Sequence, residues 1–545
     1  MITQPDARKA GLCRHYGSVV ALAIAAIVMP AQAATLACNA SALPTLAAMV
    51  DPALGVTLSS ATPGATVAGD YCRVAGVIGP SPSTIGFAVG LPMNNWNGRF
   101  LMSGDGGFDG TASLPLNRLA QGYVVANSDS GHVTPPSNDA IWAFNNRTTE
   151  VDYGYRAVQV TTQVAKQIAR GFFKGKAIKY AYFEGCSTGG RQAMMASQRY
   201  PEEFDGIVGG APAFDLTGLA VEQNWSLQKF RGAGSISGKS SNLFKAVMAK
   251  CDAVDGLTDG LIEDPRACHF DPAVDFPACA PGTDLATCLT PAQASALADV
   301  YDGPQTSRGK GKSLYPGKPL GSESWWNLWL LPDLTGTPAQ GGFTFSFMNY
   351  LFFKNDPGPG YNWFDFNFDK DPQKAGTMSK ILDALDPKLK DMQRQGGKLI
   401  LYHGAADGLI TPLRTIEYYE EVMDKNPARH GRGRSDSDGG AMSFARLFMV
   451  PGMDHCGAVG GGLKDWDRLA PLVNWVENGV APDAIIASQN LSGGLTRTRP
   501  LCPYPSQAQW NGSGSSDDAA NFACVMPATD KKGKAHHKRE HSKDD

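Results

Sequence analysis

Residues 177–199 read AIKYAYFEGCSTGGRQAMMASQR and join a predicted strand to a predicted helix through a tight glycine turn. Residues 177–184 have the β-rich core of a strand, and residues 191–199 favour a helix. The turn between them, residues 185–189 (GCSTG), fits the pattern G-x-S-x-G. Its glycines permit a strained turn that lifts a serine hydroxyl above a sheet, so the pattern predicts a nucleophile at Ser187. The alternative is a glycine-rich turn without chemistry.

Short apolar strands and helices alternate on both sides of this turn. Helical spacing of apolar side chains predicts a helix over residues 155–170. Further strands are predicted at residues 85–91, 99–103, 123–127, 204–209, 398–403 and 446–450. Strands separated by helices indicate an α/β fold with a mainly parallel sheet, and the G-x-S-x-G turn makes it an α/β-hydrolase core.

The alternation is lost between residues 215 and 386. This segment holds four cysteines, an acidic loop and a dense aromatic block, in which 14 of the 44 residues from 325 to 368 are Phe, Trp or Tyr. We predict a large inserted lid domain at residues 215–386, which divides the core into residues 34–214 and 387–528. Most of the rings are expected in the core of that domain, and some are expected to line a cleft over Ser187.

A serine nucleophile needs a histidine base and an orienting acid, which in this fold follow the serine in the order acid, then histidine. Chain position reduces the nine histidines to His403 and His455. His455 follows a predicted strand and is the expected base, while Asp407 follows the preceding strand and is the expected acid. His403 lies only four residues before Asp407 and is expected to support it. Asp454 is the rival acid, but adjacent side chains in an extended loop point apart.

The two ends of the chain are predicted to lie outside the folded body. Residues 1–33 have a basic start, an apolar run at residues 18–29 and a small-residue cleavage site ending at Ala33, which is typical of a signal peptide. Residues 529–545 are charged and nearly free of apolar side chains, which predicts a disordered basic tail. The exported chain keeps ten of eleven cysteines, so we expect disulfides and a secreted or periplasmic location.

Composition excludes several other classes of protein. The 545 residues are 43% hydrophobic and 19% charged, which is typical of a globular chain and not of a disordered or collagen-like one. The net charge of -3 offers no basic surface to nucleic acid. No stretch is apolar over a length that spans a bilayer, so we expect no membrane span.

Cys186 precedes the predicted nucleophile and Cys456 follows the predicted base, so a folded triad would bring these cysteines together. This Cys-Ser, Asp and His-Cys constellation resembles the tannase and feruloyl esterase family of α/β-hydrolases. The resemblance covers nearly the whole mature chain, and residues 451–456 and 497–505 look like the bacterial branch that includes mono(2-hydroxyethyl) terephthalate hydrolase. Similar stretches are residues 96–100 (WNGRF), 104–107 (GDGG) and 497–505 (RTRPLCPYP).

The resemblance has two structural implications. An oxyanion hole would combine the backbone N–H of Thr188 with a donor from the loop at Gly106 and Gly107, where glycine lets the backbone approach a developing negative charge. Five disulfides are implied: Cys38–Cys72, Cys186–Cys456, Cys251–Cys268, Cys279–Cys288 and Cys502–Cys524.

Residues 251–264 (CDAVDGLTDGLIED) form an acidic loop whose carboxylates would repel one another without a cation. Hard oxygen ligands suit Ca²⁺, although the spacing is not that of an EF-hand. The resemblance implies a structural Ca²⁺ held by the side chains of Asp252, Asp255 and Asp259 and the carbonyls of Leu257 and Leu261. The alternative is a solvated acidic turn.

These features together predict a secreted serine carboxylic ester hydrolase for esters of small aromatic acids, feruloyl or galloyl esters among them. A mono(2-hydroxyethyl) terephthalate hydrolase type of esterase is the alternative; a peptidase and a non-catalytic aromatic-binding protein are less favoured. No arginine occurs between Arg308 and Arg394, and Lys354 is the only cation within the aromatic block. We therefore expect uncharged aromatic acyl groups to be preferred over a terephthalate monoester, whose carboxylate an arginine would hold bidentately.

Overall fold

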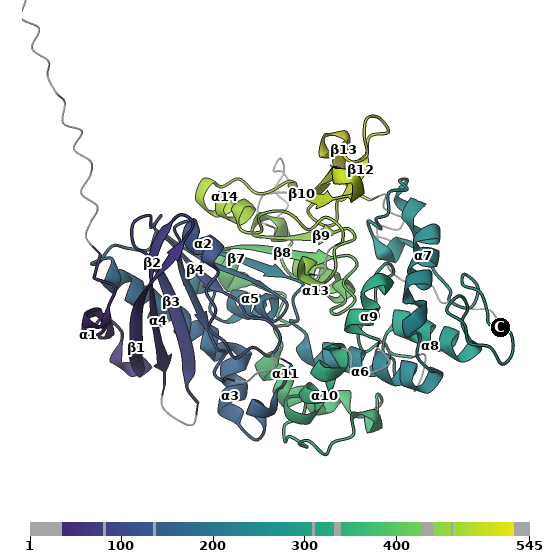
Figure 1. Cartoon of the computed structure of the whole chain (residues 1–545), viewed down its shortest axis with the longest axis horizontal. Helices are drawn as coiled ribbons and strands as arrows, with labels where there is room; N and C mark the ends of the chain where they lie inside the picture. The colour runs from purple at the N-terminus through teal and green to yellow at the C-terminus, as the bar shows by residue number, and fades with distance from the viewer. Residues whose placement is uncertain are drawn as a thin grey trace, which may run out of the picture.

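The computed structural model describes residues 35–79, 83–133, 138–307, 311–331, 339–427, 440–458 and 461–527. Among these residues, nine strands form one central sheet in the order β1-β2-β3-β5-β4-β6-β7-β8-β9 (Figure 1). The strands from β5 to β9 run parallel, and β1, β2 and β3 add an antiparallel edge. The strands are β1 (Val56–Thr66), β2 (Gly69–Ile78), β3 (Ile85–Pro92), β4 (Arg99–Ser103), β5 (Val124–Ser128), β6 (Tyr180–Cys186), β7 (Gly206–Gly210), β8 (Lys398–Gly404) and β9 (Ala445–Val450).

The predicted α/β fold with a mainly parallel sheet is confirmed. Every strand predicted from the sequence is present, as β3 to β9, with small differences at the ends. The hairpin of β1 and β2 was not predicted, because neither strand has a continuous apolar run: β1 alternates mostly between exposed and half-buried residues, and β2 mostly between half-buried and buried ones. The predicted helix at residues 155–170 is a π-helical turn, Asp152–Arg156, followed by α4 (Ala157–Phe172).

The sheet is buried on both faces because successive side chains of each strand point to opposite sides. On β4, Phe100 and Met102 pack against one core, and Leu101 between them packs against another. The first core includes α4, α5 (Thr188–Arg199) and α13 (Pro412–Lys425). The second includes α2 (Leu116–Ala120) and α14 (Ala470–Asn478). The helices cover both faces of the sheet but not its carboxyl edge, where the loops that follow β4, β6, β8 and β9 lie.

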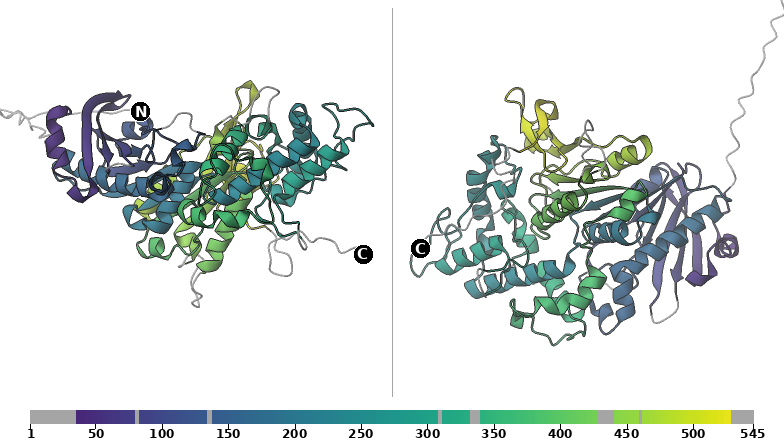
Figure 2. Two further views of the ribbon diagram at one scale, coloured as in Figure 1. Left: turned by 90° about the horizontal axis from the view of Figure 1, so that it is seen from below. Right: turned by 180° about the vertical axis from the view of Figure 1, so that it is seen from behind.

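Residues 215–386 contribute helices, and none of their described residues joins the central sheet. Two of these helices, α7 (Ser240–Cys251) and α8 (Pro291–Asp302), lie at the opposite end of the molecule from the β1–β2 hairpin, as the teal and purple segments of Figure 2 show. The domain boundaries at 215 and 386 stay a prediction. The helices are α6 (Leu216–Ala233), α7 (Ser240–Cys251), α8 (Pro291–Asp302), α9 (Trp326–Trp329), α10 (Ala339–Tyr350) and α11 (Gly376–Leu382).

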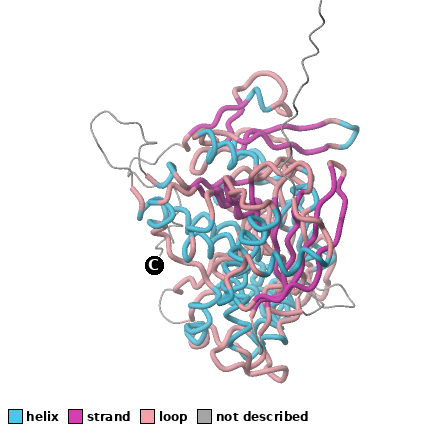
Figure 3. The backbone as a smooth tube through the Cα atoms, turned by 90° about the vertical axis from the view of Figure 1, so that its left-hand side faces the viewer, coloured by secondary structure: helices cyan, strands magenta, loops and turns pink. Residues whose placement is uncertain are grey.

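Two small antiparallel ribbons follow the sheet near the C-terminus. One pairs β10 (Ile485–Asn490) with β11 (Thr496–Leu501), and the other pairs β12 (Gln507–Trp510) with β13 (Phe522–Val525). Figures 1 and 3 both show them above the central sheet. The predicted signal peptide at residues 1–33 and the predicted tail at residues 529–545 lie outside the described residues. No described helix has the length and apolar character needed to span a membrane.

The structure contains the five disulfides that the resemblance implies. Two of them brace the helical segment, one ties the N-terminal segment to β2, and one ties Cys502, which directly follows β11, to β13. The fifth joins the end of β6 to the loop after β9. The bonded pairs are Cys38–Cys72, Cys251–Cys268, Cys279–Cys288, Cys502–Cys524 and Cys186–Cys456.

Candidate active site

Ser187 lies in the sharp turn between β6 and α5. Its backbone has φ +65° and ψ -120°, a combination that residues other than glycine rarely adopt. The turn needs glycine on either side of the serine, because a Cβ on Gly185 would lie 2.7 Å from the backbone of Gly189. The N–H of Ser187 donates to the carbonyl of Gly210 at 3.0 Å, which fixes the turn to β7. The strained turn presents the serine hydroxyl at the carboxyl edge of the sheet.

The structure brings Ser187, His455 and Asp407 together from three different loops. Nε2 of His455 lies 3.0 Å from Oγ of Ser187, and Nδ1 lies 2.8 Å from Oδ2 of Asp407. Asp407 follows β8 and is fully buried, and His455 follows β9 and is 6% exposed. In this arrangement the imidazole can accept the serine proton while the carboxylate holds its other nitrogen.

The carboxylate of Asp407 is held in its ionised form by its surroundings. Burial alone would raise its pKa, but His455 and His403 hold the pKa below its ordinary value. Oδ1 also accepts the backbone N–H groups of Leu409 and Ile410, both at 2.9 Å. Nε2 of His403 lies 3.2 Å from Oδ2, so His403 contacts the acid, as its position in the sequence indicated.

The loop of residues 104–107 lies beside Ser187 and Thr188. The carbonyl of Asp105 accepts the N–H of Gly189 at 2.8 Å. The Asp105 side chain is buried, which raises its pKa well above the ordinary value, and it accepts hydrogen bonds from Asn127, Ser130 and Gln192. Gly107 lines the pocket that contains Ser187 and Thr188, whereas Gly106 does not line it.

A tyrosine that sequence reasoning missed contacts this loop. The hydroxyl of Tyr153 donates to the carbonyl of Gly107 at 3.1 Å, and the hydroxyl of Thr188 donates to the same oxygen. Tyr153 lies in the π-helical turn, whose altered hydrogen bonding leaves carbonyls in need of partners. Arg191 of α5, fully buried, donates to the carbonyls of Tyr153 and Gly154 at 2.8 Å and lies 4.4 Å from the ring centre of Tyr153.

The pocket over Ser187 is half open to solvent, encloses about 50 Å³, and has mainly apolar walls. Phe108, which follows the 104–107 loop, packs edge-on against Phe343 of α10. Trp329 of α9 lies edge-on to His455, with ring centres 5.7 Å apart. No Arg, Lys, Asp or Glu lines this pocket in the described part of the chain. Its other wall residues include Leu216, Gln223, Phe347, Leu409 and Ile410.

The acidic loop is held by the chain's own donors. The Asp252 carboxylate accepts the N–H groups of Asp259 and Gly260, and Oδ2 of Asp259 lies 2.6 Å from the Arg499 guanidinium. Burial raises the pKa of Asp255 to about 6, and the charges of Asp259 and Asp252 add to the shift. Within the described residues, no group of three or more His, Cys, Asp or Glu is arranged to hold a metal ion. A bound cation would relieve the repulsion of Asp255 by the charges of Asp252 and Asp259. The calcium site itself stays a prediction.

Comparison with known proteins places this chain among esterases. The sequence model described as "Tannase and feruloyl esterase" matches residues 72–525. Mono(2-hydroxyethyl) terephthalate hydrolase of Piscinibacter sakaiensis is 34% identical in an alignment 556 positions long, which covers 89% of each chain. Feruloyl esterase B of Aspergillus niger is 30% identical in an alignment 485 positions long, which covers 84% of this chain and 87% of that one.

Two solved structures have the same fold over most of their length. The crystal structure of feruloyl esterase B from Aspergillus oryzae superposes with a TM-score of 0.75 at 26% identity, over 89% of this chain and 99% of that one. Tannin acyl hydrolase from Aspergillus niger superposes with a TM-score of 0.71 at 20% identity, over 90% of this chain and 96% of that one.

Proposed function

The chain belongs to the tannase and feruloyl esterase family and is a carboxylic ester hydrolase, and on that premise we propose that it is a secreted serine esterase for uncharged esters of small aromatic acids. The observation that carries the proposal is the contact of His455 with both Ser187 and Asp407, at 3.0 and 2.8 Å.

In the proposed reaction Ser187 is the nucleophile. Its Oγ attacks the ester carbonyl carbon while Nε2 of His455 takes the hydroxyl proton, and Asp407 stabilises the imidazolium through Nδ1–H. The N–H of Thr188 and a donor of the 104–107 loop stabilise the oxyanion. When the tetrahedral intermediate collapses, His455 gives its proton to the leaving alcohol. Water then attacks the acyl-enzyme by the same steps and releases the acid.

The pocket over Ser187 supports the choice of acyl group. Its walls are the rings of Phe108, Phe343 and Phe347 with aliphatic side chains, and an aromatic acyl group can pack on such rings. The free carboxylate of a terephthalate monoester would lose its hydration there without gaining an ion pair, because no cation lines the pocket among the described residues. We therefore propose methyl ferulate and simple gallates as better substrates than mono(2-hydroxyethyl) terephthalate.

A hydrolysis panel of these esters with the purified mature protein tests the proposal. We expect kcat/KM for methyl ferulate or a gallate to exceed that for the terephthalate monoester by roughly ten- to a hundredfold, which corresponds to about 1–3 kcal/mol. The terephthalate monoester as the best substrate would contradict the choice of acyl group. Absence of hydrolysis of every ester, with Ser187 unlabelled by a fluorophosphonate, would contradict the mechanism itself.

Two further parts of the proposal concern location and metal. Export after cleavage at Ala33 is supported by the five disulfides, which form in oxidising compartments. A structural Ca²⁺ at Asp252, Asp255 and Asp259 is supported by the closeness of these carboxylates in one loop, in which Asp252 is buried, Asp259 half-buried and Asp255 exposed. Mass spectrometry of the secreted protein identifies the mature N-terminus and any bound metal.

A further inference from the structure

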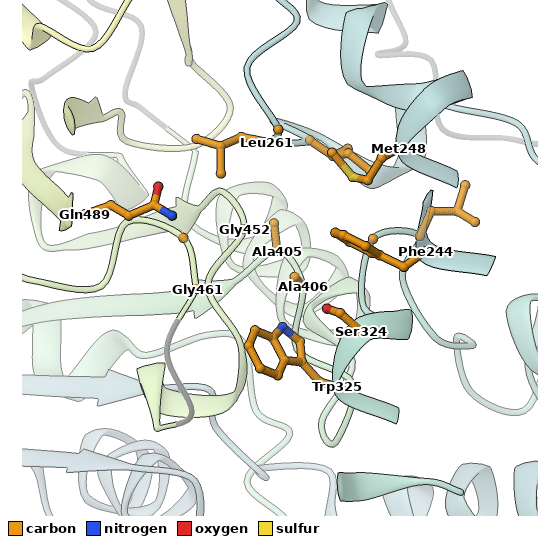
Figure 4. Close-up of a pocket in the computed structure, with 15 residues that line it drawn as sticks. Phe244, Met248, Leu261, Ser324, Trp325, Ala405, Ala406, Gly452, Gly461 and Gln489 are labelled. Carbon is orange, nitrogen blue, oxygen red and sulfur yellow. The ribbon is translucent and has the colours of Figure 1, made fainter. Parts of the chain in front are cut away.

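A second cavity lies between α7, the acidic loop and the loops that follow β8 and β9. Its volume is about 170 Å³, larger than the pocket over Ser187, and the two share no lining residue. In Figure 4, Phe244 and Trp325 face it from two sides, Leu261 and Met248 lie above it, and Gln489 reaches in opposite Phe244.

In the walls of this cavity, glycine backbone packs closely against apolar side chains. Glycines let the backbone approach its apolar side chains: a Cβ on Gly452 would lie 2.6 Å from Leu261, and one on Gly461 would lie 2.7 Å from Trp325. The side chains of Phe244, Met248 and Trp325 are only half-buried, so they present apolar surface to the cavity. An apolar cavity of roughly 150 Å³ accommodates one benzene ring.

One polar group in this cavity is without a partner. Oε1 of Gln489 is buried and accepts no hydrogen bond from any described residue. A buried acceptor left unpaired costs free energy, which a ligand carrying an O–H would recover. The cavity has no Lys or Arg among its described lining residues, so a carboxylate would bind poorly there.

We propose that this cavity is a second binding site, for an uncharged single-ring phenol. The ring would lie between Phe244 and Trp325, and its hydroxyl would donate to Oε1 of Gln489. The ligand chemistry follows from the aromatic walls, the one-ring volume and the unpaired acceptor.

The site contacts the two chain segments that carry the acid and the base. Ala405 and Ala406, which line it, directly precede Asp407, and Gly452 lies three residues before His455. The N–H of Ala406 donates to the carbonyl of Met453 at 3.1 Å, so the two segments are hydrogen-bonded to each other beside the cavity. A bound ring packs against this pair and slows its local opening, which protects the Ala406 amide from hydrogen exchange.

Crystals soaked in 4-bromophenol locate the site directly through the anomalous signal of bromine. We expect a peak between Phe244 and Trp325 whether or not a second one occurs over Ser187. A peak only over Ser187, or no peak, would overturn the proposal. The soak detects binding and needs no catalysis. It therefore tests this site even if the protein hydrolyses none of the esters in the panel.

Calorimetry in solution tests the chemistry of recognition. Phenol should bind to the Ser187→Ala protein, while toluene, which lacks the donor, and 4-hydroxybenzoate, which carries a charge, should bind at least about fivefold more weakly. Adding Gln489→Leu should raise the Kd for phenol by about five- to tenfold, and adding Met248→Trp, which fills the cavity, should abolish this binding. The matched control is Gln509→Leu at an exposed site on β12, which should leave the Kd unchanged.

Hydrogen exchange completes the test. Saturating phenol should slow exchange of the Ala406 amide in the Ser187→Ala protein and in the Gln509→Leu control, and should leave it unchanged in the Met248→Trp protein. Equal phenol affinity in the Gln489→Leu, Met248→Trp and control proteins would show that phenol occupies only the pocket over Ser187, and the proposal would be wrong.

Discussion

Cys186 and Cys456 are bonded to each other although 270 residues separate them, and each is the immediate neighbour of a residue in the proposed triad. The bond therefore joins the turn that carries Ser187 to the loop that carries His455. In the chain-entropy description, a crosslink over a loop of this length stabilises the fold by about 5 kcal/mol. Its position gives it a second effect, because it limits how far the serine and the imidazole can separate.

The first prediction concerns this crosslink. The double change Cys186→Ser with Cys456→Ser should lower kcat/KM by more than it alters the far-UV circular dichroism, because the triad loses its covalent tie while the sheet remains. The Cys279–Cys288 bridge closes a loop of only 9 residues and lies outside the triad, so the matched double serine variant should keep its activity. Equal activity losses in the two variants would refute a special role for the bond.

The second prediction concerns the triad. Ser187→Ala and His455→Ala should lower kcat by several orders of magnitude, and Asp407→Asn by roughly 10³–10⁴-fold, with the melting temperature of Ser187→Ala near that of the parent. Steady-state assays and thermal denaturation measure both quantities. Ser241→Ala at an exposed position of α7 is the control and should behave as the parent. Near-normal turnover by Ser187→Ala would end the serine esterase mechanism.

The third prediction concerns Tyr153, whose hydroxyl holds the carbonyl of Gly107. Tyr153→Phe removes one hydrogen bond from the loop expected to stabilise the oxyanion, so kcat should fall by about five- to tenfold with little change in KM. Tyr200→Phe is a matched control, because the buried hydroxyl of Tyr200 has no hydrogen-bond partner among the described residues. A change in KM alone would assign Tyr153 to substrate binding and not to positioning of the loop.

The fourth prediction concerns the pH dependence of stability. Burial raises the pKa of Glu323 to about 7, although its side chain accepts hydrogen bonds from Tyr301 and Gly321. The unfolded chain releases this proton near pH 4.5 and the folded chain near 7, so the contribution of Glu323 to stability falls as pH rises between these values. Glu323→Gln removes this contribution and should gain stability relative to the parent over that window, on the order of 1–3 kcal/mol.

Urea denaturation at pH 4.5, 6 and 7.5 measures this difference. The control Glu202→Gln, at an exposed position, should show the same pH dependence as the parent. A constant stability difference between Glu323→Gln and the parent at all three pH values would show that Glu323 titrates alike in the folded and unfolded chains.

The fifth prediction concerns calcium. Chelation should lower the melting temperature by several degrees and added Ca²⁺ should restore it, because an ion bound only by the folded chain stabilises it by mass action. Asp252→Asn and Asp255→Asn should reproduce the effect of chelation, whereas Asp424→Asn at an exposed site should not. If neither the chelator nor the loop variants change the melting temperature, the loop is a solvated turn held by Arg499 and backbone N–H groups.

The sequence contained local signals for some features and none for others. Ser187, Asp407 and His455 were recognisable because each follows a short apolar strand, and the order of strands along the chain fixes which loops meet. The π-helical turn at Tyr153 was not predictable from its own residues, since its carbonyls depend on Arg191, almost 40 positions away. The pocket walls also depend on contacts between residues that are distant in the sequence. Phe108 packs against Phe343, and no local periodicity predicts this contact.

The pocket over Ser187 has two kinds of wall, and their origin bears on how new specificities can arise. The proposed reacting groups come from loops of the central sheet, whereas Leu216, Phe343 and Phe347 come from α6 and α10, which lie between Ser187 and Asp407 in the chain. Substitution in these helices can reshape the proposed acyl pocket while the strands that position the proposed triad keep their sequence. Substrate range and ester hydrolysis can therefore be selected separately. A library of variants restricted to α6 and α10 should contain proteins with altered substrate ranges that still hydrolyse esters.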